Sequence, residues 1–225
     1  MPWMVSLGGF TSQNVWEHQC GGSLITSKHV LTAAHCFLED RTQRWVNGWQ
    51  MRAGATDLMD NNNGILRKIT YEWHPKYQGK AYFDVAVVFA DVPIDFTDKI
   101  IPVCLPMRPV DDIEALKDDF VNLAGWGRAY NVTIGDFTLD STLKLLNLQV
   151  NPTSVCNDIF DAEKITEQGI DTLTSEGVVG RKLRQQIPQG FKSDISCVGN
   201  DFDIEQGSCE GDSGSPVIRR ISGIV

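Results

Sequence analysis

Short stretches in which apolar and polar residues alternate run along most of the chain, and clusters of Gly, Asn and Asp separate them. An alternation with a period of two residues predicts β-strands. The close spacing of these stretches favours an all-β barrel or sandwich over strand–helix–strand units with a parallel sheet. The segments with the strand pattern are 3–7, 21–34, 49–54, 65–73, 83–90, 120–127, 141–151, 195–199 and 215–225.

Four segments are expected to differ from a plain strand. We predict a helical turn around Leu31–His35 and a short helix near Pro152–Phe160. Residues 104–120 contain prolines and then acidic residues, which we interpret as a linker between two halves of the molecule. Residues 161–193 are polar and include the basic run RKLRQQ, and they predict a solvated surface loop.

Composition and charge argue against several classes of protein. The 225 residues are enough for one or two domains with a sizeable core. A net charge of −9, with no basic block long enough to suggest such a surface, argues against nucleic-acid binding. The longest apolar runs, such as residues 85–90, are far too short to span a membrane. We expect no cofactor and no metal, because the Asp57–Asn63 segment offers no convincing set of oxygen ligands for calcium.

Six cysteines, at positions 20, 36, 104, 156, 197 and 209, include no C-x-x-C pair. Their pattern favours disulfides formed in an oxidising compartment over zinc binding or thioredoxin-like chemistry. The first residues, MPWMVSL, have neither the basic start nor the apolar core of a signal peptide. We therefore expect an extracellular protein whose signal peptide and true N-terminus lie upstream of Met1.

The stretch GSCEGDSGSPV, residues 207–217, carries the strongest candidate chemistry. A serine hydroxyl is a weak nucleophile that needs a neighbouring base, and the base needs an orienting acid. Gly211 lacks a Cβ, so a substrate carbonyl could approach backbone N–H groups there. The amides of Gly211 and Ser213 are the candidate donors for the oxyanion of a tetrahedral intermediate. Taken alone, GDSG is equally typical of a surface turn.

Only four histidines are available as the base. His35 lies among small apolar residues in LTAAHC. We expect His18 and His29 to be exposed in polar strand-end contexts, and His74, which precedes a proline, to be structural.

Asp84 is the leading candidate for the acid. It precedes an apolar run that should be buried, and a carboxylate there needs a partner. No histidine follows Ser213 and no aspartate precedes His35, which excludes the orders found in α/β-hydrolases and subtilisins. The order that remains is His35, Asp84, Ser213.

Six motifs follow one another along the chain in the order known from one protein family: PWMVSL, CGGSLITSKHVLTAAHC, FDVAVV, IPVCLP, GWG and GSCEGDSGSPV. With them the chain resembles the chymotrypsin/trypsin-like serine proteases. The resemblance implies two antiparallel six-stranded β-barrels, the second incomplete at its C-terminus, with an active site between them. It implies an N-terminal barrel in 1–105, and a linker and C-terminal barrel in 106–225. In that reading His35 is the general base, Asp84 orients it and Ser213 is the nucleophile.

The resemblance also implies how the cysteines pair. Cys20–Cys36 would close a loop beside the catalytic histidine, and Cys156–Cys197 would staple the second barrel. Cys104 would join an N-terminal prodomain before Met1. Cys209 would pair with a cysteine after residue 225.

Several positions depart from the family pattern or refine it. Asp212 would form the activation salt bridge with a new N-terminal ammonium, but the chain starts after that stretch would end. It also ends with SGIV, residues 222–225, so we expect an internal piece of a longer protease, or a shortened homologue, that is inactive as it stands. Ser215 replaces a usual glycine, and Asn131 begins an N-glycosylation sequon expected in a loop after GWG.

The specificity pocket would be formed in part by Gly207, Ser208 and Glu210. Gly207 provides no charge at the pocket floor, which favours a chymotrypsin- or elastase-like preference over cleavage at Arg and Lys. Glu210 borders the site and would disfavour acidic substrates.

Two functional hypotheses follow from these residues. The first is a secreted serine endopeptidase made as a zymogen, acting on proteins or peptides and subject to protein inhibitors. The second is a non-catalytic homologue that uses the same fold as a binding or regulatory module. The complete set of His35, Asp84 and Ser213 favours the first.

Overall fold

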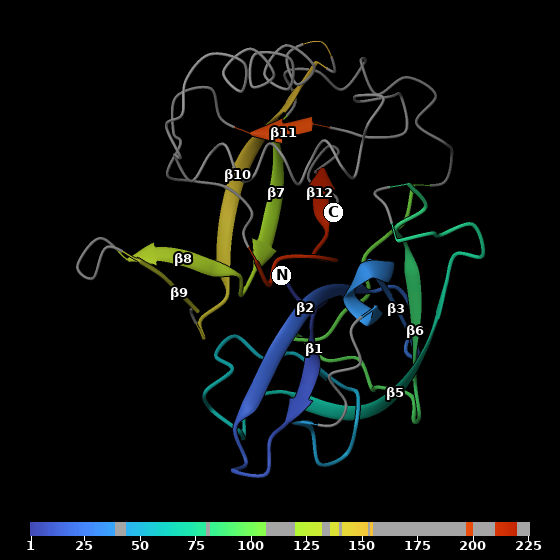
Figure 1. Ribbon diagram of the computed structural model, residues 1–225, viewed down its shortest axis with the longest axis vertical. Coiled ribbons are helices and arrows are strands. Elements are labelled where there is room, and N and C mark those ends of the chain that lie inside the picture. The colour runs from blue at the N-terminus through green and yellow to red at the C-terminus, as the bar shows by residue number, and fades with distance from the viewer. Residues whose placement is uncertain are drawn as a thin grey trace.

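The computed structural model describes residues 1–38, 44–79, 82–106, 120–131, 136–139, 141–152, 154, 197–199 and 210–219. The described residues form two β-rich halves, one above the other in the view of Figure 1. No helix in these ranges is long and apolar enough to cross a membrane.

The first half is a closed antiparallel barrel in the order β1-β2-β3-β6-β5-β4. The barrel closes because β1 pairs with β2 along one edge and with β4 along the other. A single 3-10 turn, η1, follows β3. The elements are β1 (Met4–Phe10), β2 (Trp16–Leu24), β3 (His29–Thr32), η1 (Ala34–Phe37), β4 (Gln50–Ala53), β5 (Ile65–Trp73) and β6 (Ala86–Ala90).

The alternating pattern of the sequence is clearest in β6. Ala86, Val88 and Ala90 are buried, whereas Val87 and Phe89 between them are half-buried. Side chains that alternate across a strand place every second residue in the barrel interior. The residues without exposed surface include Val5, Leu7, Leu24, Val30, Met51 and Val88.

The second half contains a four-stranded sheet in the order β11-β10-β7-β12 and a separate β8–β9 hairpin. Val121 and Leu123 of β7 pack with Leu148 and Val150 of β10 in a small apolar cluster. The elements are β7 (Phe120–Gly125), β8 (Arg128–Asn131), β9 (Asp136–Leu139), β10 (Lys144–Asn151), β11 (Cys197–Gly199) and β12 (Val217–Arg219). A closed barrel followed by this second sheet confirms the predicted all-β fold of the trypsin-like kind.

Three sequence predictions need correction here. The segment 21–34 is not one strand, because β2 ends at Leu24 and β3 starts at His29. The N–H of Ile25 donates to the carbonyl of His29 (2.9 Å), which turns the chain between the two strands. The helical turn lies at Ala34–Phe37 rather than at 31–35. Asn131 is not in a loop but is the last residue of β8.

Other predicted segments lie wholly or largely outside the described residues. They are the linker 104–120, the surface loop 161–193 and the helix at 152–160. The domain boundary between residues 105 and 106 stays a prediction.

A buried arginine organises the loop after β4. Arg52 has no exposed surface, and its guanidinium donates to the carbonyls of Leu58 (2.9 Å), Asn63 (2.7 Å) and Asp60. Burial lowers the pKa of Arg52, and the carboxylates of Asp57 and Asp60 oppose that shift. The loop is therefore built around a cation that the chain itself supplies.

The same loop joins the two halves of the molecule. The N–H of Leu58 donates to the carbonyl of Ser141 (2.9 Å), and the N–H of Leu143 donates to the carbonyl of Thr56 (2.7 Å). The indole N–H of Trp126 also donates to Thr56 (3.4 Å). Trp126 lies just after β7, so these contacts fix the second sheet against the barrel.

Candidate active site

His35 and Asp84 meet at one end of the barrel. His35 lies in η1, and Asp84 lies two residues before β6. One oxygen of the Asp84 carboxylate is 2.6 Å from Nδ1 of His35, and the other accepts the backbone N–H of His35 (2.8 Å). The imidazole is 42% exposed and the carboxylate 22%. A carboxylate that uses both oxygens on one residue fixes the ring's position and leaves Nε2 as the ring nitrogen that Asp84 does not engage.

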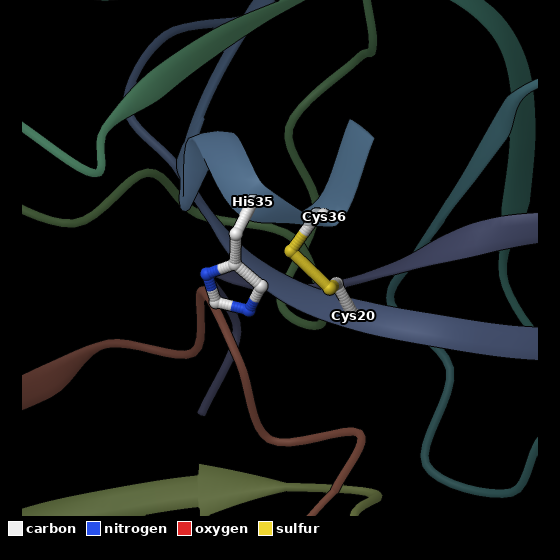
Figure 2. Close-up of side chains that lie close together, drawn as sticks. All are labelled: Cys20, His35 and Cys36. Atoms are coloured by element: carbon white, nitrogen blue, oxygen red, sulfur yellow. A yellow bond between two sulfur atoms is a disulfide. The ribbon is translucent and has the colours of Figure 1, made fainter. Parts of the chain in front are cut away.

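A disulfide supports the turn that carries His35. Cys20 of β2 is joined to Cys36 of η1, as predicted, with the Cα atoms 6.2 Å apart. Figure 2 shows the imidazole of His35 projecting from the residue next to the bridge. In the chain-entropy model a loop this short contributes about 3 kcal/mol to the stability of the fold. Cys20, His35 and Cys36 cluster closely enough to suggest metal ligands, but the disulfide uses both sulfurs.

Ser213 lies beside this turn. Its carbonyl accepts the N–H of Gly21 (2.8 Å) and is 4.0 Å from the sulfur of Cys36. The structure thus brings residue 213, which is 177 positions away from Cys36 in sequence, next to the residue that follows His35. Among the described contacts no hydrogen bond joins the Ser213 hydroxyl to His35. Such bonds are often long without substrate and shorten when it binds.

The backbone of the segment 210–213 is shaped by glycine. Gly211 has φ of +101°, a region that residues with a Cβ rarely adopt. A side chain at this position would therefore strain the backbone of this segment.

Asp212 explains the GWG motif. Its carboxylate accepts the N–H of Gly127 (2.8 Å), and a Cβ added at either Gly125 or Gly127 would overlap the carboxylate oxygens. Trp126 between them is buried. Both glycines thus leave room for the Asp212 carboxylate, which ties the segment 210–213 to the end of β7. The salt bridge proposed for Asp212 stays a prediction.

His18 is a residue of the site that the sequence interpretation missed. The expectation that it is exposed was wrong. Its Nδ1 is 2.7 Å from the hydroxyl of Ser6, and its Nε2 is 2.8 Å from the carbonyl of Gly211. Its ring also packs edge-on against Trp126, with the ring centroids 5.6 Å apart.

Burial lowers the pKa of His18 from 6.5 to about 4, against the opposing effects of the Gly211 carbonyl and Asp212. A neutral imidazole donates through only one nitrogen, so the Ser6 hydroxyl donates to Nδ1 and the Nε2–H donates to Gly211. The indole N–H of Trp16 in turn donates to the Ser6 oxygen (3.0 Å). His18 therefore restrains the peptide group that follows Gly211. No local signal marks it, because its partners come from β1 and from residue 211.

The rim of the site carries an ion pair. Glu210 is strongly exposed, and its carboxylate is 3.2 Å from Nε of Arg128. The N–H of Arg128 also donates to the carbonyl of Glu210 (2.8 Å), so side chain and backbone both join the start of β8 to the segment 210–213. The other residues assigned to the specificity pocket, Gly207 and Ser208, lie outside the described residues.

The remaining cysteine predictions are not tested. Cys156 and Cys209 lie outside the described residues, and of Cys197 only the backbone in β11 is described. Cys104 is an exposed free thiol.

Ser215 fills a place where the two halves meet. Its hydroxyl occupies the position that a Cβ on Gly21 would take, and it lies near Gly125 as well. The hydroxyl is buried, and within the described part of the chain it has no hydrogen-bond partner.

Comparison with known proteins agrees with this geometry. A protein-family model described as Trypsin matches residues 1–225. The chain belongs to the trypsin family. It is 27% identical over 220 residues to the clotting factor G beta subunit of Tachypleus tridentatus, and 28% identical over 235 residues to melanization protease 1 of Drosophila melanogaster. It is 27% identical over 221 residues to chymotrypsin-C of Rattus norvegicus.

Each match covers 96% of the chain. The matched parts are 61%, 50% and 67% of these trypsin-family relatives, in the same order. The chain therefore spans between half and two thirds of their length.

Proposed function

We propose that this trypsin-family chain is the catalytic part of a serine endopeptidase. The observation that carries the proposal is the double contact of Asp84 with His35. Because Nδ1 of His35 faces Asp84 at 2.6 Å, Nε2 is the nitrogen left to accept a proton from a nucleophile. Ser213, held beside the same turn, is the nucleophile.

The reaction follows the scheme common to this family of proteases. The Ser213 oxygen attacks the carbonyl carbon of the scissile peptide bond while Nε2 of His35 takes the hydroxyl proton. Negative charge moves to the carbonyl oxygen, where the N–H groups of Gly211 and Ser213 stabilise it. His35 then gives the proton to the leaving amine as the C–N bond breaks. Water hydrolyses the resulting acyl-enzyme by the same route.

The positioning of Gly211 supports this role for its N–H. The segment 210–213 is tied to the barrel through His18 and Gly21, and to the second half of the molecule through Gly127 and Arg128. Donors that are fixed before the reaction stabilise developing charge without a reorganisation cost at that moment.

The substrate class is a protein or peptide, and we propose that cleavage is not restricted to Arg and Lys. Gly207 would leave the pocket floor without a carboxylate, and a cation buried there without a partner would cost several kcal/mol. Large apolar side chains such as Phe, Tyr or Leu are the favoured residues. The names of the relatives point to different processes, so no single physiological substrate is proposed.

The remaining features of the proposal concern the whole protein. We propose that it acts outside the cell, where the Cys20–Cys36 disulfide persists. It is made as a zymogen, and activation creates a new N-terminal ammonium that forms a salt bridge with Asp212. Cys104 joins a prodomain, Cys156 pairs with Cys197, and protein inhibitors bind the site. The two halves are the units 1–105 and 106–225.

The test is hydrolysis of a protein substrate by the full-length, proteolytically processed protein and by two variants. Ser213→Ala should lower kcat by about 10⁶-fold, as removal of such a nucleophile does in other serine proteases. Ser215→Ala, the matched control two residues away, should retain the native kcat. Hydrolysis that survives Ser213→Ala would overturn the assignment. A native protein that folds but cleaves nothing would instead favour a non-catalytic binding module.

A further inference from the structure

The residue before Asp84 has an unusual backbone. Phe83 has φ of +59°, in the left-handed region that bulky residues rarely adopt. The other non-glycine residue with positive φ in the described part of the chain is Asn14 (φ 60°), in the turn between β1 and β2. Asparagine tolerates that region, whereas phenylalanine does not. Outliers of this kind persist only where the surroundings hold them, and they gather at functional sites.

Aromatic stacking accounts for how Phe83 is held. Its ring lies nearly parallel to the ring of His74, with the centroids 4.9 Å apart and an angle of 12° between the planes. Lys76, two residues after His74, places its ammonium 5.5 Å from the Phe83 ring centroid. The N–H of Lys76 also donates to Nδ1 of His74 (3.1 Å), which fixes the imidazole beneath the ring. Phe83 is 47% exposed, so these contacts rather than burial hold it.

The same turn also reaches the other side of Asp84. The N–H of His74 donates to the carbonyl of Val85 (2.9 Å), and the N–H of Val85 donates to the carbonyl of Phe83 (2.8 Å). The second bond closes a tight turn with Asp84 at its centre. His74 thus contacts both neighbours of Asp84, one through its ring and the other through its backbone.

Residues 74–77 form a turn that Tyr77 closes, because its N–H donates to the carbonyl of His74 (2.9 Å). Burial, and then the negative charge of Asp84, raise the pKa of Tyr77 to about 12. The segment 74–77 therefore lies against the residues on both sides of Asp84.

We propose that Phe83, held in the left-handed conformation by its stack on His74, is a positioning residue that aims the Asp84 carboxylate at His35. The inference rests on the proposed function for its kinetic consequence. Its structural claim concerns only the direction of Asp84. A change of φ at residue 83 rotates everything that follows, and Asp84 is the next residue. Both of its short contacts with His35 (2.6 and 2.8 Å) depend on that direction.

The kinetic test compares variants at position 83 in the full-length protein. Phe83→Tyr keeps the ring and should keep the native kcat. Phe83→Ala loses the stack but keeps a Cβ, and it should lower kcat at least about tenfold with little change in KM. The upper limit is about 10²-fold, the loss that a 1 Å misplacement of a catalytic group can cause. Phe83→Asn loses the same ring but tolerates positive φ, and should recover most of kcat.

A matched control is available on β6. Phe89 also contacts a histidine, His29, at a centroid distance of 5.2 Å, but it does not adjoin Asp84. Phe89→Ala should therefore leave kcat unchanged. If Phe83→Ala does not fold, His74→Asn is the second variant. It retains an acceptor for the N–H of Lys76 while removing the stack, and it should lower kcat in the same way.

Proton NMR without substrate separates this inference from the proposed function. A short hydrogen bond between Nδ1 of His35 and the Asp84 carboxylate should give a far-downfield resonance. That resonance should shift or vanish in Phe83→Ala and return in Phe83→Asn, whether or not the protein cleaves peptides. A native resonance and native kcat in both Phe83→Ala and His74→Asn would overturn the proposal. Equal impairment of Phe83→Ala and Phe83→Asn would also overturn it, since backbone conformation would then not be the cause.

Discussion

Two regions of the barrel that carry a histidine contact the segment 210–213. At η1, His35 is 42% exposed and lies against the carboxylate of Asp84, while its neighbour Cys36 contacts the Ser213 carbonyl. On β2, His18 is held between a hydroxyl and the carbonyl of Gly211. The first histidine has a charged partner and access to solvent. The second has neutral partners and a pKa lowered to about 4 by burial.

The difference separates two tasks that one residue type can perform. A histidine with a carboxylate on one nitrogen and solvent beside the other can take and return a proton. A half-buried histidine that stays neutral keeps a fixed pattern of one donor and one acceptor, which suits it to hold a backbone segment in place. We infer that His35 supplies the chemistry and that His18 holds the donors used by that chemistry. Changes at the His35 region should then mainly lower kcat, and changes at the His18 region should mainly lower the free energy of unfolding.

The largest effect is expected at the His35 region. Asp84→Asn keeps the shape of the side chain but favours the wrong tautomer of His35, because the amide can donate to Nδ1. We expect kcat to fall about 10⁴-fold, the size of effect that this change has where the three residues form a catalytic triad. The free energy of unfolding should change little. Steady-state kinetics and urea denaturation of the same preparation measure both quantities, and a stability loss without a loss of kcat would contradict the division of tasks.

A pH effect is expected at the His18 region. Because the pKa of His18 is about 4 in the folded protein and 6.5 in the unfolded chain, the unfolded chain binds the extra proton between those values. Stability from this residue is therefore complete above pH 6.5 and is lost as the pH falls toward 4. The loss between pH 7 and pH 5 should be roughly 2 kcal/mol.

Urea denaturation at pH 7 and pH 5 measures this effect. The control is His18→Gln, which offers a donor and an acceptor but does not titrate. The free energy of unfolding of His18→Gln should fall less between pH 7 and pH 5 than that of the native protein, by roughly 2 kcal/mol. Equal pH dependence in the native protein and His18→Gln would show that His18 is not held neutral.

Removing the His18 side chain altogether should affect stability more than catalysis. His18→Ala leaves the Gly211 carbonyl and the Ser6 hydroxyl without this partner, which should lower the free energy of unfolding by about 1–3 kcal/mol. A smaller loss of kcat than in Asp84→Asn should accompany it, because the N–H of Gly211 is held less firmly. A kcat loss as large as that of Asp84→Asn, with unchanged stability, would instead place His18 in the chemistry.

The smallest effect is expected at Ser215, which packs between Gly21 and Gly125 and whose hydroxyl makes no hydrogen bond among the described residues. Ser215→Ala removes a buried hydroxyl and should change stability by at most about 1 kcal/mol, in the stabilising direction. Thermal unfolding measures it. A clear destabilisation would show that the hydroxyl has a partner essential to the fold.

The sequence predicted those parts of the structure that rest on local patterns. Alternating apolar residues marked β6, and the apolar run after Asp84 pointed to a carboxylate that needed a partner. The position of Cys20–Cys36 came from the family resemblance and is confirmed.

The parts it missed depend on contacts between distant residues. His18 was read as exposed because its neighbours in sequence are polar, whereas its environment is set by Ser6 and Gly211. Phe83 looked like the first residue of a strand, and only the folded backbone shows its positive φ. The β8–β9 hairpin was read as a loop, because its short strands carry no clear alternation.

The most direct test of the account is to locate the residue that an electrophile labels. The full-length, processed protein is treated with a fluorophosphonate, which reacts with activated serine hydroxyls, and the modified residue is found by mass spectrometry of its peptides. We expect one adduct, on Ser213, that is absent from His35→Ala and strongly reduced in Asp84→Asn. An adduct on another residue, or labelling of Ser213 that does not depend on His35, would contradict it.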